Sequence, residues 1–296
     1  MWVAGLFLDP YTVAEKLLEW VEEDAPFGDL TTGYTVPRGL WARAVVVLKS
    51  RAVPACLEPV VEALRILGFN AKPLVEEAAW VEPPRGVLEV AGEARRILLF
   101  ERTLLNLLIY TFSVATTTRM MVEAAHRINP RVRIAATRKT PPGLRYFAKC
   151  AVAVGGGDTH RLSLSDAVLV KDNHVRIAGS VAEAVRRAKA RTSFAHRVEV
   201  EVSSLEEAVE AIEAGADIVM IDNQPPEVVA EIVGELGRRG LRDRVLIEAS
   251  GGIDLSNVAD YAATGVDIIS SSMLTMSPVR VDLSLRVVEV RELRSA

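Results

Sequence analysis

The sequence predicts an α/β protein of two domains, the second of which is a barrel of parallel strands. A length of 296 residues suits about two domains of roughly 150 residues each. From about residue 115, short runs rich in Val and Ile alternate with longer helical patterns, as they do where crossover helices join parallel strands. Polar residues follow these apolar runs, which is expected where strand ends form a site.

The first region, up to about residue 110, mixes helices with strands. Apolar residues recur with helical spacing over three segments, which are Val13–Val21 after Asp9, Pro59–Leu67, and Glu93–Tyr110. Two short Val-rich runs, Ala42–Leu48 and Val87–Ala91, are expected to be strands. The segment Asp24–Thr32 is rich in turn residues, and we expect a loop there.

The second region is expected to contain six strands, at Val132–Ala136, Ala167–Val170, Arg197–Val202, Ile218–Ile221, Val245–Ala249 and Val266–Ile269. Helices are expected between the later strands, at Val181–Ala190, Leu205–Ala214 and Glu227–Leu236. An open doubly wound sheet would divide the polar strand ends between two sides of a switch point, whereas a barrel brings them to one rim. We therefore favour a barrel, although six strands are fewer than the usual eight.

Composition excludes several classes of protein. Half of the residues are hydrophobic and 25% are charged, as in ordinary globular proteins, and the net charge of −4 gives no sign of a surface for nucleic acid or membrane. The longest apolar segment, Leu98–Val114, is interrupted by polar residues, and the N-terminus lacks the basic region of a secretory signal. We expect a cytoplasmic protein that binds neither nucleic acid nor membrane.

Two residue types are scarce. The two cysteines, Cys56 and Cys150, are too few for a disulfide framework or a structural zinc site, and we expect buried, idle thiols. Gln224 is the only glutamine, and thermolabile amides are typically rare in proteins of thermophilic origin.

Acidic residues concentrate at two neighbouring strand ends. Glu199 and Glu201 alternate with valines, so both carboxylates lie on one strand face, which is the interior of a barrel. Buried carboxylates need a cationic partner. Together with Asp222 they suit Mg²⁺, which usually shares its ligands with substrate phosphates. The alternative is an internal ion-pair network with Arg138 and Lys171.

Basic residues gather in the same region, at Arg138, Lys139, His160, Arg161 and Lys171. Arg binds carboxylates and phosphates in bidentate fashion and Lys acts as a mobile point charge, so a cluster in an acidic protein indicates a polyanionic ligand. The alternatives are solvated surface charges and, for His160 and His174, ordinary core histidines. The turns at Ser250, Gly251 and Gly252 and at Ser270, Ser271 and Ser272 could bind phosphate through backbone N–H groups, or could be plain turns.

Motifs along nearly the whole chain together resemble the quinolinate phosphoribosyltransferase family, also called nicotinate-nucleotide pyrophosphorylase (carboxylating). They are Asp24–Thr32, Glu101–Asn106, Ala115–Thr118, Thr137–Arg145, Gly155–Arg161, Lys171–His174, Val198–Val202, Ile221–Asn223, Ala249–Ile253 and Ile269–Ser277. The Arg-Lys-Thr, Lys-Asp-Asn-His and Gly-Gly-Gly-x-x-His-Arg motifs are specific in this order and spacing. The chain departs from the family pattern at Ala148, Ser272 and Met276.

The resemblance implies an N-terminal α/β sandwich domain over residues 1–112 and an incomplete, TIM-like α/β barrel over 113–277. It implies that the segment 278–296 returns to the first domain. The implied reaction converts quinolinate and 5-phosphoribosyl-1-diphosphate (PRPP) to nicotinate mononucleotide, diphosphate and CO₂ in NAD biosynthesis. The implied assembly is a homodimer, or a larger assembly of dimers, in which Arg102 completes the neighbouring subunit's site.

The resemblance also implies a role for each site residue. The quinolinate carboxylates would be held by Arg102, Arg138, His160, Arg161 and Lys171. Lys139 and Lys171 would face PRPP, and Glu201 and Asp222 would engage the ribose hydroxyls and Mg²⁺. The 5′-phosphate would lie in a cradle made by Ser250, Gly251, Gly252, Ser270, Ser271 and Ser272.

Three alternatives remain at this point. A nicotinate phosphoribosyltransferase can use the same fold, but nicotinate has one carboxylate and the full set of cations suits a dicarboxylate. A paralogue associated with molybdate transport is the second. The third, from another class, is a Schiff-base aldolase that uses Lys171, which would need a depressed lysine pKa and a carbonyl substrate.

Overall fold

The computed structural model describes residues 8–292, and these residues divide into two units. Unit 1 holds the described residues up to Thr117, the segment Tyr146–Gly156 and the residues from Pro278 onward. Unit 2 holds Thr118–Arg145 and Gly157–Ser277. The segment Tyr146–Gly156 therefore packs with unit 1, although the strands on either side of it in the sequence belong to the barrel.

Unit 1 is built on an antiparallel sheet with the strand order β10-β1-β3-β2. The strands are β1 (Leu40–Leu48), β2 (Asn70–Pro73), β3 (Arg85–Glu93) and β10 (Leu283–Glu292). Every second residue of β1 is buried, as its run of Ala and Val predicts for a strand with one covered face. β10 pairs with the whole of β1, from Leu40 opposite Glu292 to Leu48 opposite Leu283, so the end of the described chain returns to this sheet.

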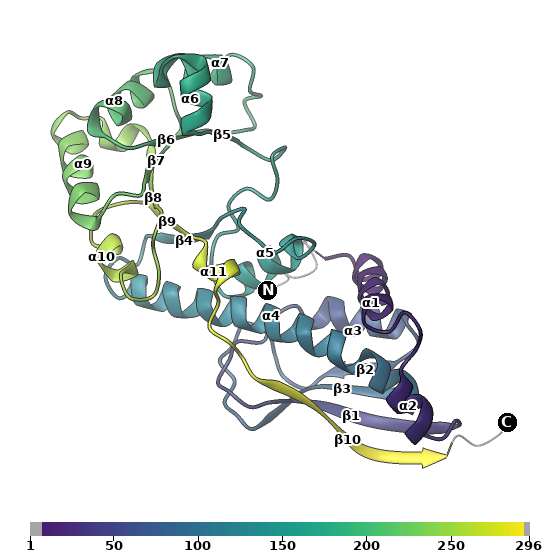
Figure 1. Ribbon diagram of the computed structural model, residues 1–296. Helices are drawn as coiled ribbons and strands as arrows, with labels where there is room; N and C mark the ends of the chain where they lie inside the picture. Colours follow the sequence, from purple (N-terminus) through teal and green to yellow (C-terminus); the bar gives the residue numbers. More distant parts are fainter. Residues whose placement is uncertain (1–7, 293–296) are drawn as a thin grey trace. The chain divides into compact units, whose positions relative to one another are not determined.

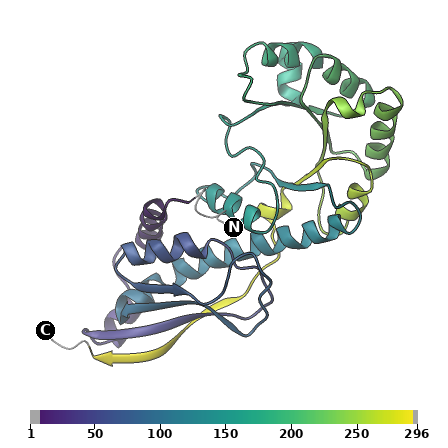
Figure 2. The same ribbon diagram turned by 180° about the vertical axis from the view of Figure 1, so that it is seen from behind.

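Helices lie on one side of this sheet (Figures 1 and 2). They are α1 (Pro10–Asp24), α2 (Leu30–Thr35), α3 (Leu57–Ile66), α4 (Ala94–His126) and α5 (Arg145–Val154). The loop expected over Asp24–Thr32 is wrong in its last residues, because Asp29 caps α2 by accepting a hydrogen bond from the Thr32 N–H at 3.0 Å.

The helix α4 continues well beyond the end expected at Tyr110. Its added turns contain threonines, which have low helix propensity, but burial and backbone contacts compensate for this. Thr117, for example, is fully buried and its hydroxyl donates to the Ser113 carbonyl at 2.8 Å. By length and composition α4 could cross a membrane, but 61% of its most apolar window is buried, as in the core helix of a soluble protein.

Unit 2 is a parallel sheet of six strands in the order β4-β9-β8-β7-β6-β5. The strands are β4 (Arg133–Ala136), β5 (Val168–Val170), β6 (Val198–Val202), β7 (Ile218–Asp222), β8 (Leu246–Ser250) and β9 (Ile268–Ser271). The sheet curves into an arc, and Asp158 extends it beyond β4 through a bridge to Ala135. This arrangement confirms the predicted incomplete barrel with six strands (Figure 1).

The crossover helices lie on the outside of the arc of strands (Figure 1). They are α6 (Asp172–Ala178), α7 (Val181–Lys189), α8 (Leu205–Glu213), α9 (Pro226–Arg238) and α10 (Val258–Ala262), and a short helix α11 (Met273–Met276) follows β9. Strand β6 is the clearest case of the resulting two-sided pattern, because Val198, Val200 and Val202 are buried towards the helices. Its two glutamates therefore face the interior of the barrel, as their alternation predicts.

Candidate active site

A cavity of about 350 Å³ opens at the carboxyl ends of the barrel strands. Its lining contains ten of the residues that the sequence singled out, namely Arg138, Lys139, His160, Arg161, Lys171, Glu201, Asp222, Ser250, Gly251 and Ser270. Most of them follow or end a strand of one parallel sheet, whose carboxyl ends share a rim, and His160 and Arg161 follow the residue Asp158 that bridges to β4. The cations and the acids therefore face a common space.

A second cavity of about 390 Å³ adjoins the first, because Lys139, Asn223, Ser250, Gly251 and Ser270 line both. The remaining members of the predicted phosphate cradle line this second cavity, namely Gly252, Ser271 and Ser272. The cradle thus extends the cationic cavity to one side. The combined space suits a ligand with two anionic regions.

Glycine is required at the tightest point of this cradle. Gly251 has a φ of +94°, and a Cβ on it would lie 2.8 Å from the backbone nitrogen of Asn223. The same Asn223 N–H donates to the Ser250 carbonyl at 2.8 Å, which fixes the turn against the end of β7. The chain approaches so closely here that no side chain fits, which leaves backbone groups at the surface of the cavity.

The charges at the rim differ in how they are paired. The Lys171 ammonium donates to the Glu201 carboxylate, and Asp222 accepts a hydrogen bond from the Asn223 side chain at 2.6 Å. The Nε of Arg138 is buried and has no hydrogen-bond partner among the residues from 8 to 292. A buried donor on a charged group that lacks a partner is expected where a ligand supplies the acceptor.

Two residues that the sequence analysis singled out, Arg102 and His174, lie outside the two cavities. Arg102 is exposed on α4 in unit 1 and lines neither of the two cavities. His174 lies in the first turn of α6, where its Nδ1 accepts a hydrogen bond from the Lys171 N–H at 2.8 Å. This contact fixes the backbone of Lys171 at the end of β5, so His174 supports a site residue.

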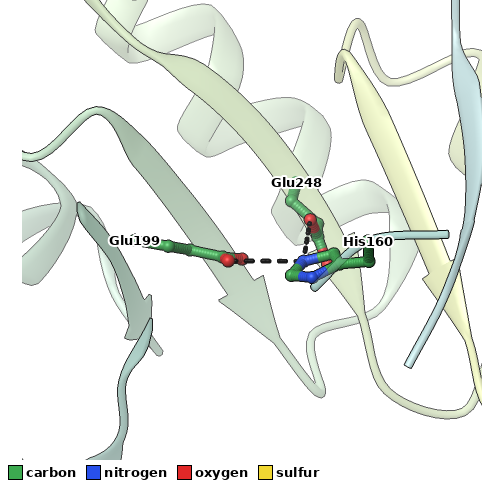
Figure 3. Close-up of side chains that lie close together, drawn as sticks. All are labelled: His160, Glu199 and Glu248. Carbon is green, nitrogen blue, oxygen red and sulfur yellow. Dashed lines mark ion pairs between the residues drawn. The ribbon is translucent and has the colours of Figure 1, made fainter. Parts of the chain in front are cut away.

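Beneath the rim lies a group that the sequence analysis did not assemble, which we call the interior triad: His160, Glu199 and Glu248 (Figure 3). His160 Nε2 is 3.3 Å from a carboxylate oxygen of Glu199 and 3.3 Å from one of Glu248. The side chains of these residues are 14%, 4% and 0% exposed, respectively. Glu248 precedes the rim residue Ser250 by two positions, as Glu199 precedes Glu201, and this period of two was the available signal.

The interior triad holds more protons than its separate groups would. Burial lowers the pKa of His160, but the two carboxylates outweigh this effect and raise the pKa to about 10. Burial, and then the charge of Glu248, raises the pKa of Glu199 despite its contact with the imidazole. The Arg161 N–H points at His160 Nδ1 from 2.7 Å, so a proton on that nitrogen requires this contact to break. Whether the imidazole or Glu199 takes the proton, the triad retains one at neutral pH.

Two groups of residues could hold a metal ion. The ligand atoms of the interior triad lie within 4.8 Å of one another, but Nδ1 accepts from the Arg161 N–H, so the ring proton lies on Nε2 and faces the carboxylates. In this arrangement Nε2 is a hydrogen-bond donor to the carboxylates and is not free to bind a metal ion. Glu201 and Asp222 end neighbouring strands and both line the cavity, and carboxylate oxygens open to a phosphate-sized space fit Mg²⁺.

The chain matches two models of one protein family over most of its length. Residues 29–112 match the N-terminal domain of quinolinate phosphoribosyl transferase, and residues 114–286 match its C-terminal domain.

Curated proteins agree with these matches. The chain is 44% identical over 269 residues to a probable nicotinate-nucleotide pyrophosphorylase [carboxylating] of Methanothermobacter thermautotrophicus, covering 91% of this chain and 96% of that protein. It is 38% identical over 288 residues to the human nicotinate-nucleotide pyrophosphorylase [carboxylating], covering 96% and 94%.

A solved structure has the same fold as this chain. The crystal structure of NadC from Streptococcus pyogenes superposes with a TM-score of 0.85 at 33% identity, covering 97% of this chain and 99% of that one.

Proposed function

The chain belongs to the quinolinate phosphoribosyltransferase family, and we propose that its strand-end cavity joins quinolinate to PRPP. The products are nicotinate mononucleotide, diphosphate and CO₂, which makes the protein a pentosyltransferase of NAD biosynthesis. One observation of the structure carries this proposal. Five cationic side chains, two rim carboxylates and a Ser/Gly cradle share adjoining cavities in a chain whose net charge is −4.

The cations of the cavity suit the two carboxylates of quinolinate. Arg138 and Arg161 both line the cavity, and each guanidinium can bind a carboxylate through two parallel hydrogen bonds. Lys171 can exchange its contact with Glu201 for one with substrate, because its side chain is 44% exposed. Both nitrogens of His160 contact protein groups, so we assign it chiefly to fixing the backbone at Arg161, whose backbone N–H donates to Nδ1.

The other side of the site suits PRPP. The cradle of Ser250 to Gly252 and Ser270 to Ser272 would bind the 5′-phosphate through hydroxyl and backbone N–H groups. Glu201 and Asp222 would accept hydrogen bonds from the ribose hydroxyls and would hold Mg²⁺. When bound there, Mg²⁺ supplies positive charge to the diphosphate. Lys139, which lines both cavities, would stabilise the negative charge that develops as diphosphate leaves.

The proposed reaction mainly requires that the protein hold the two substrates in the right positions. The ribose C1 loses diphosphate and becomes electron-poor, and the pyridine nitrogen of quinolinate forms the new bond to it. The carboxylate at position 2 then leaves as CO₂, and its bonding electrons remain on the ring carbon beside the cationic nitrogen until a proton is taken up there. Neighbouring Arg and Lys side chains favour the charges of both steps. No covalent intermediate with the protein is required.

Substrate comparison tests this function. Purified protein with Mg²⁺ and PRPP is expected to release CO₂ from quinolinate and to form nicotinate mononucleotide. Consumption of nicotinate with PRPP, while quinolinate is ignored, would instead support the nicotinate-specific alternative. Trapping of a carbonyl substrate on Lys171 by borohydride would support the aldolase alternative.

We also propose a homodimer, or a larger assembly of dimers, in which Arg102 of one subunit completes the site of its neighbour. The exposure of Arg102 on α4 supports this, because an arginine there is accessible to a second subunit. Mixing Arg102→Ala and Arg138→Ala subunits, each inactive alone, is expected to restore about a quarter of the wild-type activity, because half of the random dimers contain one intact site. Mixed dimers without activity would contradict the shared site. The cytoplasmic location stays a prediction.

A further inference from the structure

The fold brings the only two cysteines of the chain together. Cys56 precedes α3, Cys150 lies in α5, and the two are 94 residues apart in the sequence. Their sulfur atoms are nevertheless 2.8 Å apart, and both side chains are fully buried within unit 1. The sequence suggested two idle thiols, and their contact is a property of the fold alone.

The separation of the sulfurs is shorter than a packing contact. Carbon-sized atoms in van der Waals contact keep about 3.5–4.0 Å between them. A disulfide bond is about 2.05 Å long, so the separation of 2.8 Å lies between bonding distance and ordinary contact. The fold therefore already holds the two thiols against each other.

The backbone of Cys56 is in an unusual conformation at this contact. Its φ of 61° and ψ of 23° are left-handed, a region that residues other than glycine seldom adopt. Its side chain makes no capping hydrogen bond to α3 that would explain the conformation. Such outliers persist where the surroundings hold them in place, and here the side chain is directed towards α5, where it also lies 3.9 Å from the Phe147 carbonyl.

Other roles for the pair are poorly supported. Two ligands are too few for a structural zinc site. A nucleophilic role needs a thiolate, but burial raises the pKa of Cys56 well above its usual value, and the contact with Cys150 adds to the rise. Neither cysteine lines the two strand-end cavities, so the pair has no direct part in the proposed reaction.

We propose that Cys56 and Cys150 form an intramolecular disulfide that ties α5 to the start of α3. Both S–H bonds break and one S–S bond forms, and two electrons and two protons pass to a disulfide-class oxidant, which becomes two thiols. The exchange runs through a mixed disulfide with one of the cysteines. It takes place before α5 packs or during its transient release, because the folded protein buries both sulfurs.

The position of α5 in the chain gives the bond a structural role. Tyr146–Gly156 packs with unit 1, while the segments on both sides of it belong to unit 2. Its attachment to unit 1 otherwise depends on noncovalent packing alone. A disulfide that closes a loop of this length removes much of the conformational freedom of the unfolded chain, and so favours the folded state.

The test refolds the reduced full-length protein in a buffer of reduced and oxidised glutathione. After denaturation without reductant, the product is expected to show no free thiols and a mass about 2 Da below that of the reduced protein. Reduction is expected to lower its Tm by roughly 5–10 °C. Two free thiols at full yield of folded protein, or stable glutathione adducts on either cysteine, would overturn the proposal.

Matched variants separate the bond from packing at the same positions. Cys56→Ala and Cys150→Ala each leave one thiol, and the Tm of each is expected to be the same with and without reductant. If either variant fails to fold, the redox dependence of the wild-type Tm and mass decides the question. Because the readouts are thiol count, mass and Tm, the outcome is independent of the proposed enzymatic activity.

Discussion

The rim of the barrel and the layer directly beneath it carry similar charges from the same strands, but those charges are held differently. On β6, Glu201 at the rim pairs with Lys171, and two residues earlier Glu199 contacts His160 in the interior. On β8, Ser250 lies at the rim and Glu248 lies in the interior. The alternation of a strand thus places functional side chains in two successive layers.

Depth decides what each layer can do. The Lys171 side chain at the rim is 44% exposed, so its ion pair can open to water or ligand at little cost. In the interior, Glu248 is fully buried, and separating it from His160 would leave a charge without compensation. We therefore assign substrate binding to the rim and the shaping and support of the cavity floor to the interior triad. Each of the following predictions tests this division.

The largest effect is expected at Arg138, whose buried Nε has no partner among the described residues. Arg138→Ala should lower kcat/KM for quinolinate about 1,000-fold, or about 4 kcal/mol, because a bidentate ionic contact to substrate is lost. Arg138→Lys, the matched control, should restore only part of it, since Lys binds as a point charge. Steady-state kinetics measures both. A large fall in unfolding free energy would show that Arg138 belongs with the interior.

In the interior, His160→Ala should act mainly on stability. It leaves two buried carboxylates without the imidazole N–H that both contact, and we expect the free energy of unfolding to fall by about 3 kcal/mol in urea titrations. Glu248→Gln is the control, and it should cost about 1 kcal/mol or less because Glu199 still faces the imidazole. Equal losses in the two variants would contradict the picture of one imidazole shared by two acids.

Glu201 tests whether a rim carboxylate works through Mg²⁺ without supporting the fold. Glu201→Gln should lower kcat/KM for PRPP about 100-fold, or about 2.7 kcal/mol, and should raise the Mg²⁺ concentration needed for half-maximal rate. Chelation by EDTA should abolish wild-type activity and should be reversed by added Mg²⁺. An unchanged Mg²⁺ requirement in Glu201→Gln would remove this residue from the metal site. Its Tm should stay within a few degrees of wild type.

The rim was more predictable from sequence than the interior, for a physical reason. Polar residues that end an apolar run, such as Lys171 and Asp222, mark the carboxyl end of a strand, and parallel strands share one rim. Glu248 lies inside the apolar run Val245–Ala249, where it reads as part of a strand. The clustering of Glu248 with His160 depends on a barrel closing across space, which local periodicity does not report.

Long-range packing also decided the features that sequence missed in unit 1. The segment Tyr146–Gly156 lies between barrel segments in the sequence, and only its tertiary contacts assign it to unit 1. The return of the segment from Pro278 to unit 1 was anticipated through family resemblance, but the exposed strand β10 that it forms was not predicted. The contact between Cys56 and Cys150 joins residues too far apart in the chain for any spacing rule to link them. Such contacts follow from the assembled fold.

The last expected effect is the pH dependence that the interior triad adds to stability. The pKa of His160 is raised to about 10 from its ordinary value of 6.5, and that of Glu199 is raised as well. A group whose pKa is higher in the folded state stabilises that state below its unfolded pKa, and the benefit is lost as pH rises through the folded value. The free energy of unfolding should therefore decrease between about pH 6.5 and pH 10.

Comparison with a variant separates the contribution of the interior triad from the titration of lysines elsewhere in the chain. In the double variant Glu199→Gln/Glu248→Gln the carboxylates that raise the pKa of His160 are gone and burial lowers it, so the imidazole is neutral over this pH range. Over the same pH range, wild type should lose more of its unfolding free energy than this variant does in urea titrations. If the free energy of unfolding changed with pH in the same way in both proteins, the interior triad would hold no extra proton. The rim and the interior would then differ in burial alone.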